Sequence, residues 1–249
     1  MVMNISRLSK RVLLLGAVAA LPASLLLAGT GPSRAEEAPR LVPAFAQSAP
    51  AAAGAEAAAG PQSITFSGGC FWGVQGVFEH VKGVTRAVSG YTGGQADTAQ
   101  YETVSTGTTG HAESVQVTYD PAQISRARLM QIFFSVALDP TQVGGQGPDS
   151  GSQYRSEIWT STPAEAGAAR AYIAQLDAAH AYGGKIVTRV DPIGGFYPAE
   201  SYHQDYLAHN PDAGYIVIND MPKVAALKQL FPQDYSETPR LTLASNKIM

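Results

Sequence analysis

The stretch SGGCFWGVQGVFEH, residues 67–80, decides the predicted fold. Its apolar residues recur with the spacing of one helix face: Phe71, Val74, Val77 and Phe78. Two glycines stand before Cys70 and interrupt the short strand-like run at 64–66. We therefore expect a strand, a glycine turn and a helix over 71–80, with Cys70 at the point where the helix opens.

The segments that follow this helix continue with strands and helices in a defined order. Hydrophobic periodicity predicts strands at 84–91 and 112–119, a helix at 125–136 and a strand at 155–159. Strand, helix, strand, strand, helix, strand is the order of the split βαβ unit. The prediction is an α+β, ferredoxin-like two-layer sandwich, in which a mixed or antiparallel sheet carries its helices on one face.

The C-terminal half is predicted in less detail. TPAE at 162–165 matches a capping box with proline at the first helical position, so we expect a helix from there to about residue 182. A strand at 186–190 follows. Beyond it, FYPAESYHQDYLAHNP at 196–211 mixes aromatic and polar residues, which indicates a long irregular C-terminal wrap.

Two glycine-rich segments, 92–111 and 139–153, match neither a helix nor a strand. Long loops inside a folded domain usually carry function. We expect these two segments to form the walls of a pocket.

Composition limits the classes of partner. The chain has 249 residues, is 45% hydrophobic and 15% charged, and has a formal net charge of -3 without a long basic run. Such a chain lacks the electrostatic footprint that binding to nucleic acid or an anionic membrane requires. We expect small-molecule or protein substrates and a monomer.

The first residues have the organisation of an export signal. Basic residues at 7, 10 and 11 precede an apolar run at 12–28, with a possible cleavage site after Ala35. An uncleaved N-terminal membrane anchor is the alternative. The predicted division is an export signal at 1–35, a disordered alanine- and proline-rich linker at 36–62, a folded domain at 63–235 and a polar tail at 236–249. The expected location is the periplasm.

Cys70 is the only cysteine in the sequence, so it is either a small buried residue or a reactive thiol. A sulfur at a helix N-terminus is stabilised as the thiolate by unpaired backbone N–H groups and the helix dipole. We therefore expect its pKa to fall and its sulfur to act as a nucleophile.

Two chemistries are compatible with such a thiol. A cysteine hydrolase or acyltransferase would pair Cys70 with His111 or His203 as base. Redox chemistry would need an acid and an apolar seat, which Glu113 and the pair Phe71 and Trp72 could supply, unless Glu113 is an exposed strand residue. In an apolar pocket, Glu113 would have a raised pKa and hold a proton. One cysteine gives no zinc-binding spacing.

Seven blocks of sequence, in order, resemble the A class of peptide methionine sulfoxide reductases. They are GCFWG at 69–73, GYTGG at 90–94, Tyr101, TGHAE at 109–113, YDP at 119–121, QYRS at 153–156 and YHQDY at 202–206. The similarity spans about 63–220, nearly the whole predicted domain. The resemblance implies that 63–235 is a catalytic reductase domain that repairs methionine S-sulfoxide, free or in proteins.

The resemblance also implies a role for each matching residue. Cys70 would attack the sulfoxide sulfur and become a sulfenic acid, and Glu113 would protonate the sulfoxide oxygen. The other matching residues would bind substrate: Phe71 and Trp72 seat the S-methyl group, Tyr101 and Tyr154 hold the oxygen, and Asp149 lies near the cysteine.

This chain departs from many members in having no second cysteine to resolve the sulfenic acid. We expect an external thiol to reduce Cys70 directly, such as thioredoxin, glutaredoxin, glutathione or dithiothreitol, without a metal or organic cofactor. A redox-sensing module without efficient turnover is a further alternative.

Overall fold

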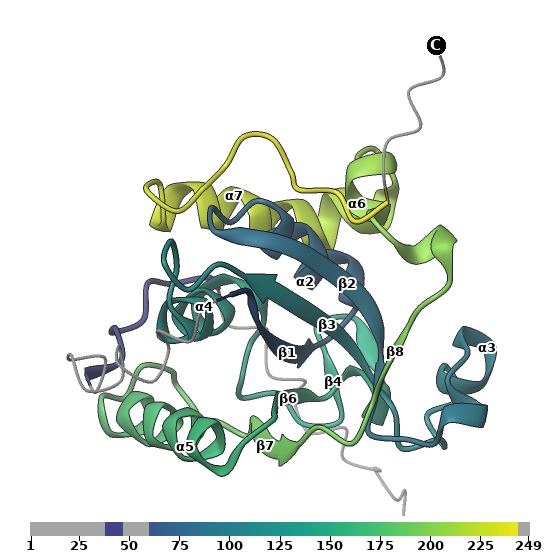
Figure 1. Ribbon diagram of the computed structural model, residues 1–249, viewed down its shortest axis with the longest axis horizontal. Coiled ribbons are helices and arrows are strands. Elements are labelled where there is room, and N and C mark those ends of the chain that lie inside the picture. The colour runs from purple at the N-terminus through teal and green to yellow at the C-terminus, as the bar shows by residue number, and fades with distance from the viewer. Residues whose placement is uncertain (1–37, 47–59, 244–249) are drawn as a thin grey trace, which may run out of the picture. The chain divides into compact units, whose positions relative to one another are not determined.

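The computed structural model describes residues 38–46 and 60–243, and its centre is a six-stranded sheet (Figure 1). The sheet order is β7-β6-β1-β3-β2-β8, and β4 and β5 form a separate small hairpin. The strands are β1 Gln62–Gly68, β2 Val84–Thr92, β3 Ala112–Tyr119, β4 Gly145–Gln146, β5 Asp149–Ser150, β6 Ser156–Thr160, β7 Arg189–Pro192 and β8 Phe196–Pro198.

The α-helices are α2 Phe71–Glu79, α3 Tyr101–Val104, α4 Arg126–Ile132, α5 Pro163–Ala178, α6 Tyr206–His209 and α7 Met221–Leu230. Two π-helical segments, η3 Phe133–Ala137 and η6 Ile216–Asp220, continue α4 and precede α7. The 3-10 turns are η2 Ala96–Thr98, η4 Ser152–Tyr154 and η5 Ser201–His203. The helix predicted from residue 71 is confirmed, with Cys70 as its N-cap.

The strand connections explain where the first helix lies. Both β1 and β2 pair antiparallel with β3, so they run parallel to each other with β3 between them and α2 as their connection. β7 pairs parallel with β6, which makes the sheet mixed. The predicted α+β class and mixed sheet are confirmed.

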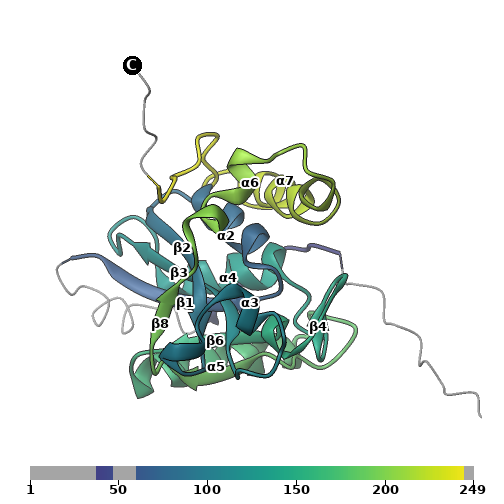
Figure 2. The same cartoon turned by 90° about the vertical axis from the view of Figure 1, so that its right-hand side faces the viewer.

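One part of the core lies between the sheet and α2. Along β3, Val115, Val117 and Tyr119 are fully buried, and by the period of two Glu113 projects from the same face. The Phe66 ring stacks on Phe78 of α2 with ring centroids 5.1 Å apart. α2 lies between this face of the sheet and the helices α6 and α7 (Figure 2). Glu113, at the start of β3, therefore lies on the core side, where the helix packs.

Several predicted boundaries need correction. The capping box is confirmed, because Thr162 accepts from Glu165 N at 3.2 Å and Glu165 accepts from Ser161 N at 2.8 Å. However, α5 ends at Ala178 rather than near 182, and the strand expected at 186–190 forms at Arg189–Pro192.

The C-terminal region is more regular than the predicted wrap. It includes α7, which packs against α2. Only Val224, Ala226 and Leu227 of this helix are buried. Tertiary contacts therefore stabilise a helix whose own apolar pattern is weak.

The expected disordered linker at 36–62 does not hold for residues 38–46. Val42 and Phe45 are buried in the core, and Tyr172 Oη of α5 donates to the Pro43 carbonyl at 2.7 Å. Gln62 already belongs to β1. Within the described chain, no helix has both the length and the apolar character to cross a bilayer. The export signal predicted at 1–35 lies outside the described residues.

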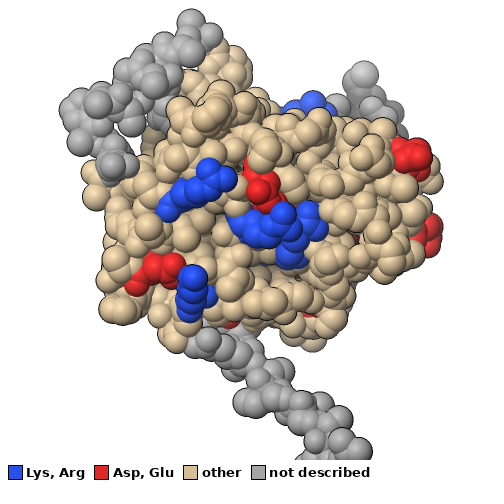
Figure 3. Space-filling view, turned by 90° about the horizontal axis from the view of Figure 1, so that it is seen from below, with Lys and Arg blue, Asp and Glu red and all other residues tan. Residues whose placement is uncertain are grey.

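The described part of the predicted polar tail is held against the domain. Arg240 N donates to the Glu79 carbonyl at 2.8 Å, and Thr242 N donates to Asp205 Oδ1 at 2.9 Å. On the face shown in Figure 3, charged side chains are few and scattered over a largely uncharged surface, and basic and acidic groups adjoin near its centre.

Candidate active site

Cys70 lies at the turn between β1 and α2. Gly69 has a φ of +88°, and a Cβ at this position would lie 2.6 Å from Cγ of Gln146. Glycine therefore permits both the left-handed backbone and the close approach of the 139–153 loop. Cys70 is buried, with 9% of the residue exposed.

The prediction that the pKa of Cys70 falls is wrong. Burial raises the pKa of this thiol well above its usual value, and the negative charges of Glu113 and Asp220 raise it further. The backbone N–H of Trp72 and the Lys223 ammonium lower the pKa, as expected at a helix start, but they do not outweigh the burial. The resting sulfur is therefore a thiol at neutral pH.

Glu113 is buried beside this thiol, which excludes the interpretation of an exposed strand residue. Its side chain is 3% exposed, and Oε2 accepts a hydrogen bond from Phe71 N, in the first turn of α2, at 3.0 Å. Burial raises the pKa of Glu113 to about 8, Asp149 and Asp220 add to the rise, and the Phe71 N–H opposes it. Glu113 is therefore a protonated acid at neutral pH, as the sequence predicted.

The two aromatic residues after Cys70 have different surroundings. Phe71 is buried and its ring centroid lies 5.8 Å from that of Tyr91, so it belongs to the core. Trp72 is half-buried and stacks on Tyr206 with centroids 3.9 Å apart, while Tyr215 meets its ring edge-on at 5.9 Å. Trp72 is thus the member of the pair that keeps exposed apolar surface.

One tyrosine from the segment 92–111 and another directly after the segment 139–153 lie near Glu113. Tyr101 is the first residue of α3, and Tyr154 ends η4. Burial raises the pKa of both tyrosines, and the ionised forms of Glu113 and Cys70 raise it further. The two hydroxyl-bearing side chains therefore lie in the electrostatic reach of the candidate nucleophile and acid.

Asp149 of β5 completes the predicted set. Its Oδ2 accepts a hydrogen bond from the hydroxyl of Tyr215, the residue that precedes η6. The charge of Asp149 also raises the pKa of Glu113. The structure thus brings together all of the residues assigned by resemblance: Cys70, Phe71, Trp72, Tyr101, Glu113, Asp149 and Tyr154.

Neither histidine is placed as a base for Cys70. His111 Nδ1 accepts from Gly94 N at 3.2 Å, and its Nε2 lies 2.9 Å from the Gln95 carbonyl, to which it donates. His203 Nδ1 accepts from Trp72 Nε1 at 3.2 Å, and burial lowers the pKa of His203, so it is neutral. Among the hydrogen bonds of the described residues, none joins either ring to the Cys70 sulfur. The geometry therefore disfavours the hydrolase.

Several residues around the site were given no role by sequence reasoning. Glu200 accepts from both Tyr91 Oη and Tyr101 N at 2.9 Å, and so fixes the start of α3. Tyr206 and Tyr215 support Trp72. The available signal for Tyr206 was the block YHQDY at 202–206, which the resemblance includes without assigning it a role.

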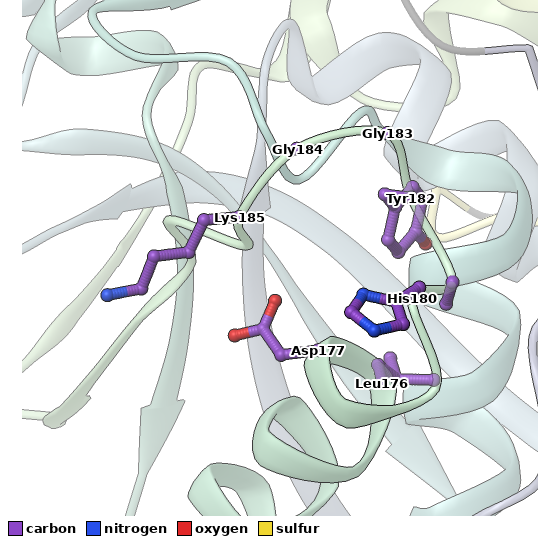
Figure 4. A pocket seen from close by; sticks show the side chains of 8 residues that line it. Leu176, Asp177, His180, Tyr182, Gly183, Gly184 and Lys185 are labelled. Carbon is purple, nitrogen blue, oxygen red and sulfur yellow. The ribbon is translucent and has the colours of Figure 1, made fainter.

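A separate cavity of about 460 Å³ lies at the end of α5 (Figure 4). It is lined by residues 176–177 and 180–185, none of which belongs to the predicted site. Within 38–46 and 60–243, no group of three His, Cys, Asp or Glu side chains could hold a metal ion. The Cys70 thiol and the Glu113 carboxyl lie together at the start of α2.

A thiol beside an acid, with a tryptophan face and two tyrosines, is a site for thiol-based reduction. The family model of peptide methionine sulfoxide reductase matches residues 62–235. The chain is 58% identical over 191 residues to peptide methionine sulfoxide reductase MsrA 2 of Mesorhizobium japonicum, covering 77% of this chain and 98% of the relative.

Solved structures agree with the sequence comparison. Methionine sulfoxide reductase A of Corynebacterium diphtheriae is 37% identical with a TM-score of 0.54, covering 63% of this chain and 78% of that one. Reduced Mxr1 from Saccharomyces cerevisiae is 33% identical with a TM-score of 0.56, covering 63% and 89%. The chain belongs to the peptide methionine sulfoxide reductase family, A class. It is an oxidoreductase that reduces methionine sulfoxide and repairs oxidised methionine.

Proposed function

We propose that Cys70 reduces methionine S-sulfoxide by taking up its oxygen. The Cys70 sulfur attacks the sulfoxide sulfur while the Glu113 carboxyl delivers a proton to the sulfoxide oxygen. This attack forms a bond between the two sulfurs. The protonated oxygen then becomes bonded to the Cys70 sulfur, the sulfur–oxygen bond of the substrate and the new sulfur–sulfur bond break, and the electron pair stays on the methionine sulfur. Methionine sulfur is reduced by two electrons and Cys70 is oxidised by two, to a sulfenic acid. The proton that leaves the Cys70 thiol replaces the proton that Glu113 gives to the oxygen, so the carboxyl is protonated again at the end of the step.

One observation carries this assignment: the Glu113 carboxyl, raised in pKa to about 8, touches the first turn of the helix that Cys70 caps. A protonated carboxyl can both donate to the sulfoxide oxygen and later accept a proton. The proximity of Tyr101 and Tyr154 supports a role in holding that oxygen. The half-buried face of Trp72 suits the S-methyl group.

We propose that an external thiol restores Cys70, because the sequence has no second cysteine. One thiol condenses with the sulfenic acid to a mixed disulfide and releases water. A second thiol attacks that disulfide and releases Cys70. Thioredoxin, glutaredoxin, glutathione or dithiothreitol could supply both thiols. The whole set of site residues comes from one chain, which supports a monomer as the active form.

We propose that the protein is exported to the periplasm. The basic residues at 7–11, the apolar run at 12–28 and Ala35 support an export signal. N-terminal sequencing of the protein recovered from a periplasmic extract tests this, with a start at residue 36 expected. Recovery of the intact chain from the membrane fraction would instead support an anchor.

The catalytic proposal is tested by a single turnover. The reduced enzyme is mixed with each epimer of a methionine sulfoxide peptide without a thiol, and Cys70 is trapped with dimedone. We expect one equivalent of methionine from the S epimer, one dimedone adduct on Cys70 and no product from the R epimer. Product from both epimers, or product without an adduct on Cys70, would refute the proposed mechanism.

A further inference from the structure

Besides the contact with Glu113, the first turn of α2 lies against an ion pair, Asp220 and Lys223, that the proposed mechanism does not use. Asp220 ends η6, and Lys223 lies in the first turn of α7. Lys223 Nζ lies 3.3 Å from Asp220 Oδ1. The side chain of Asp220 is 0% exposed and that of Lys223 is 12% exposed. Lysine is seldom buried to this degree without a specific partner, so this pair is a built feature of the fold.

Gly73 shows where the pair lies relative to Cys70. A Cβ at Gly73 would lie 2.1 Å from Asp220 Oδ1 and 3.1 Å from Lys223 Nζ. Gly73 follows the N-cap Cys70 by three residues, a spacing that places two residues side by side on a helix. The missing side chain at 73 thus makes room for the ion pair next to the sulfur.

The charges that face Cys70 come from several elements. Glu113 of β3 and Asp220 of η6 oppose its ionisation, while the Trp72 N–H of α2 and Lys223 of α7 favour it. Burial raises the pKa values of Tyr101, Tyr154 and Tyr215, and the thiolate form of Cys70 raises them further, so these tyrosines remain neutral. Among the charged side chains that act on this thiol, Glu113 and Asp220 are acids and Lys223 is a base. Asp220 holds the Lys223 ammonium group in place.

We propose that Lys223, held by Asp220, is a positioning residue whose ammonium group favours the thiolate form of Cys70. This inference rests on the proposed function, because two steps of that reaction cycle involve the thiolate form of Cys70. It attacks the sulfoxide, and it leaves the mixed disulfide when the second thiol enters. In that step a sulfur–sulfur bond to the incoming thiolate forms, the bond to Cys70 breaks, and Cys70 departs with the electron pair. A better stabilised thiolate leaves faster.

The test uses the full chain with Lys223→Gln, because glutamine can keep a hydrogen bond to Asp220 while removing the charge. Lys223→Arg restores the charge, and Lys228→Gln removes an exposed lysine from the same helix. Since Cys70 is the only cysteine, its rate of alkylation by iodoacetamide across pH reports the thiolate fraction. Dithiothreitol-driven reduction of the sulfoxide peptide gives kcat and KM.

We expect Lys223→Gln to alkylate about tenfold more slowly at pH 8, as for a shift of about one pKa unit. Lys223→Arg should stay within about threefold of the unaltered chain, and Lys228→Gln should match it. We also expect kcat to fall with Lys223→Gln while KM is unchanged, since Lys223 is not assigned to the substrate.

An alkylation profile of folded Lys223→Gln that superimposes on that of the unaltered chain would overturn this inference. Loss of rate that Lys223→Arg does not restore would overturn it too. If Lys223→Gln does not fold, Lys223→Arg still tests the inference, because it keeps the positive charge. Slower alkylation of Cys70 in Lys223→Arg would contradict a role of that charge. Failure of the proposed function looks different: the unaltered chain would then reduce no sulfoxide, whatever its alkylation profile.

Discussion

At the scale of single residues, burial favours the neutral form of both Cys70 and Glu113. A helix start favours a thiolate by about 0.3–2 kcal/mol, whereas burial can shift a pKa by several units. Burial therefore dominates at Cys70, and its pKa rises. The same burial keeps Glu113 protonated, because its neutral form is the one that low polarity favours.

Replacing this carboxyl should separate acid catalysis from nucleophilicity. We expect Glu113→Gln to slow single-turnover reduction by about 10²- to 10⁴-fold, since the amide cannot deliver a proton. Alkylation of Cys70 should persist, because the thiol remains in place and the neutral amide replaces a carboxyl that is itself neutral at pH 7. Quenched-flow measurement of methionine release checks this. Unchanged release by Glu113→Gln would remove Glu113 from the mechanism.

The position of Glu113 could have been predicted with more certainty. It shares the period of two with Val115 and Val117, which are core residues of β3. The alternation therefore places its side chain on the buried face. The hydrogen bond between Glu113 and Phe71 N could not be predicted in this way, since it joins residues that are 42 positions apart.

At the scale of elements, α2 begins at the reactive Cys70, and its first turn is tightly packed at Gly73. Its apolar periodicity is local information, and the predicted helix is confirmed to within a residue at its end. α7 lacks such a pattern and forms against α2. A helix such as α7, without an apolar pattern of its own, is difficult to predict, because its stability comes from a partner distant in sequence.

Gly73→Ala tests the packing of that first turn. Alanine would gain about 1 kcal/mol of helix propensity but would clash with Asp220, and such overpacking costs about 1–3 kcal/mol. We expect a net loss of free energy of unfolding in urea and a reduced rate of sulfoxide reduction.

Gly167→Ala is the matched control, because Gly167 lies inside α5 with open space around its Cβ position. It should stabilise the protein by about 0.5–1 kcal/mol and leave the activity unchanged. Equal gains in stability from both alanines would contradict the packing of Asp220 against α2.

At the scale of the whole domain, residues 38–46 are part of the fold. Phe45 packs on Tyr172 with ring centroids 5.3 Å apart, and Ala46 N donates to Gln175 Oε1 at 2.7 Å. Phe45→Ala should lower the free energy of unfolding by about 3 kcal/mol. Leu41→Ala, at a side chain that is 56% exposed, should change it by less than about 0.5 kcal/mol. Urea unfolding checks both, and equal effects would argue against docking of this segment.

The C-terminal segment is attached to α2 through two buried acids. Asp205 accepts from Thr242 N and Leu243 N at 2.9 and 2.8 Å. Burial raises the pKa of Glu79 to about 10, and a hydrogen bond to Asp205 and the charge of Asp205 add to the rise. A protonated Glu79 can therefore share its proton with Asp205.

This pair predicts a pH dependence of stability. The pKa of Glu79 is raised in the folded state, so its contribution is complete below the ordinary value of 4.5 and is lost as pH rises towards about 10. We expect Glu79→Gln to be more stable than the unaltered chain by about 1–3 kcal/mol at pH 8, with a smaller difference at pH 5. Thermal unfolding at both pH values checks this.

Glu102→Gln, at an exposed position of α3, serves as the control and should show no such pH dependence. A difference between Glu79→Gln and the unaltered chain that shrinks from pH 5 to pH 8 would contradict a protonated Glu79.

The sequence by itself determined the α+β class, the helix that starts at Cys70, the single thiol and the family blocks, because periodicity and motifs are local properties of the chain. Only the tertiary structure decided the raised pKa of Cys70, the ion pair of Asp220 and Lys223 beside it, and the docking of residues 38–46. Burial and the distances between charges depend on residues far apart in sequence, and those relations exist only once the chain is folded.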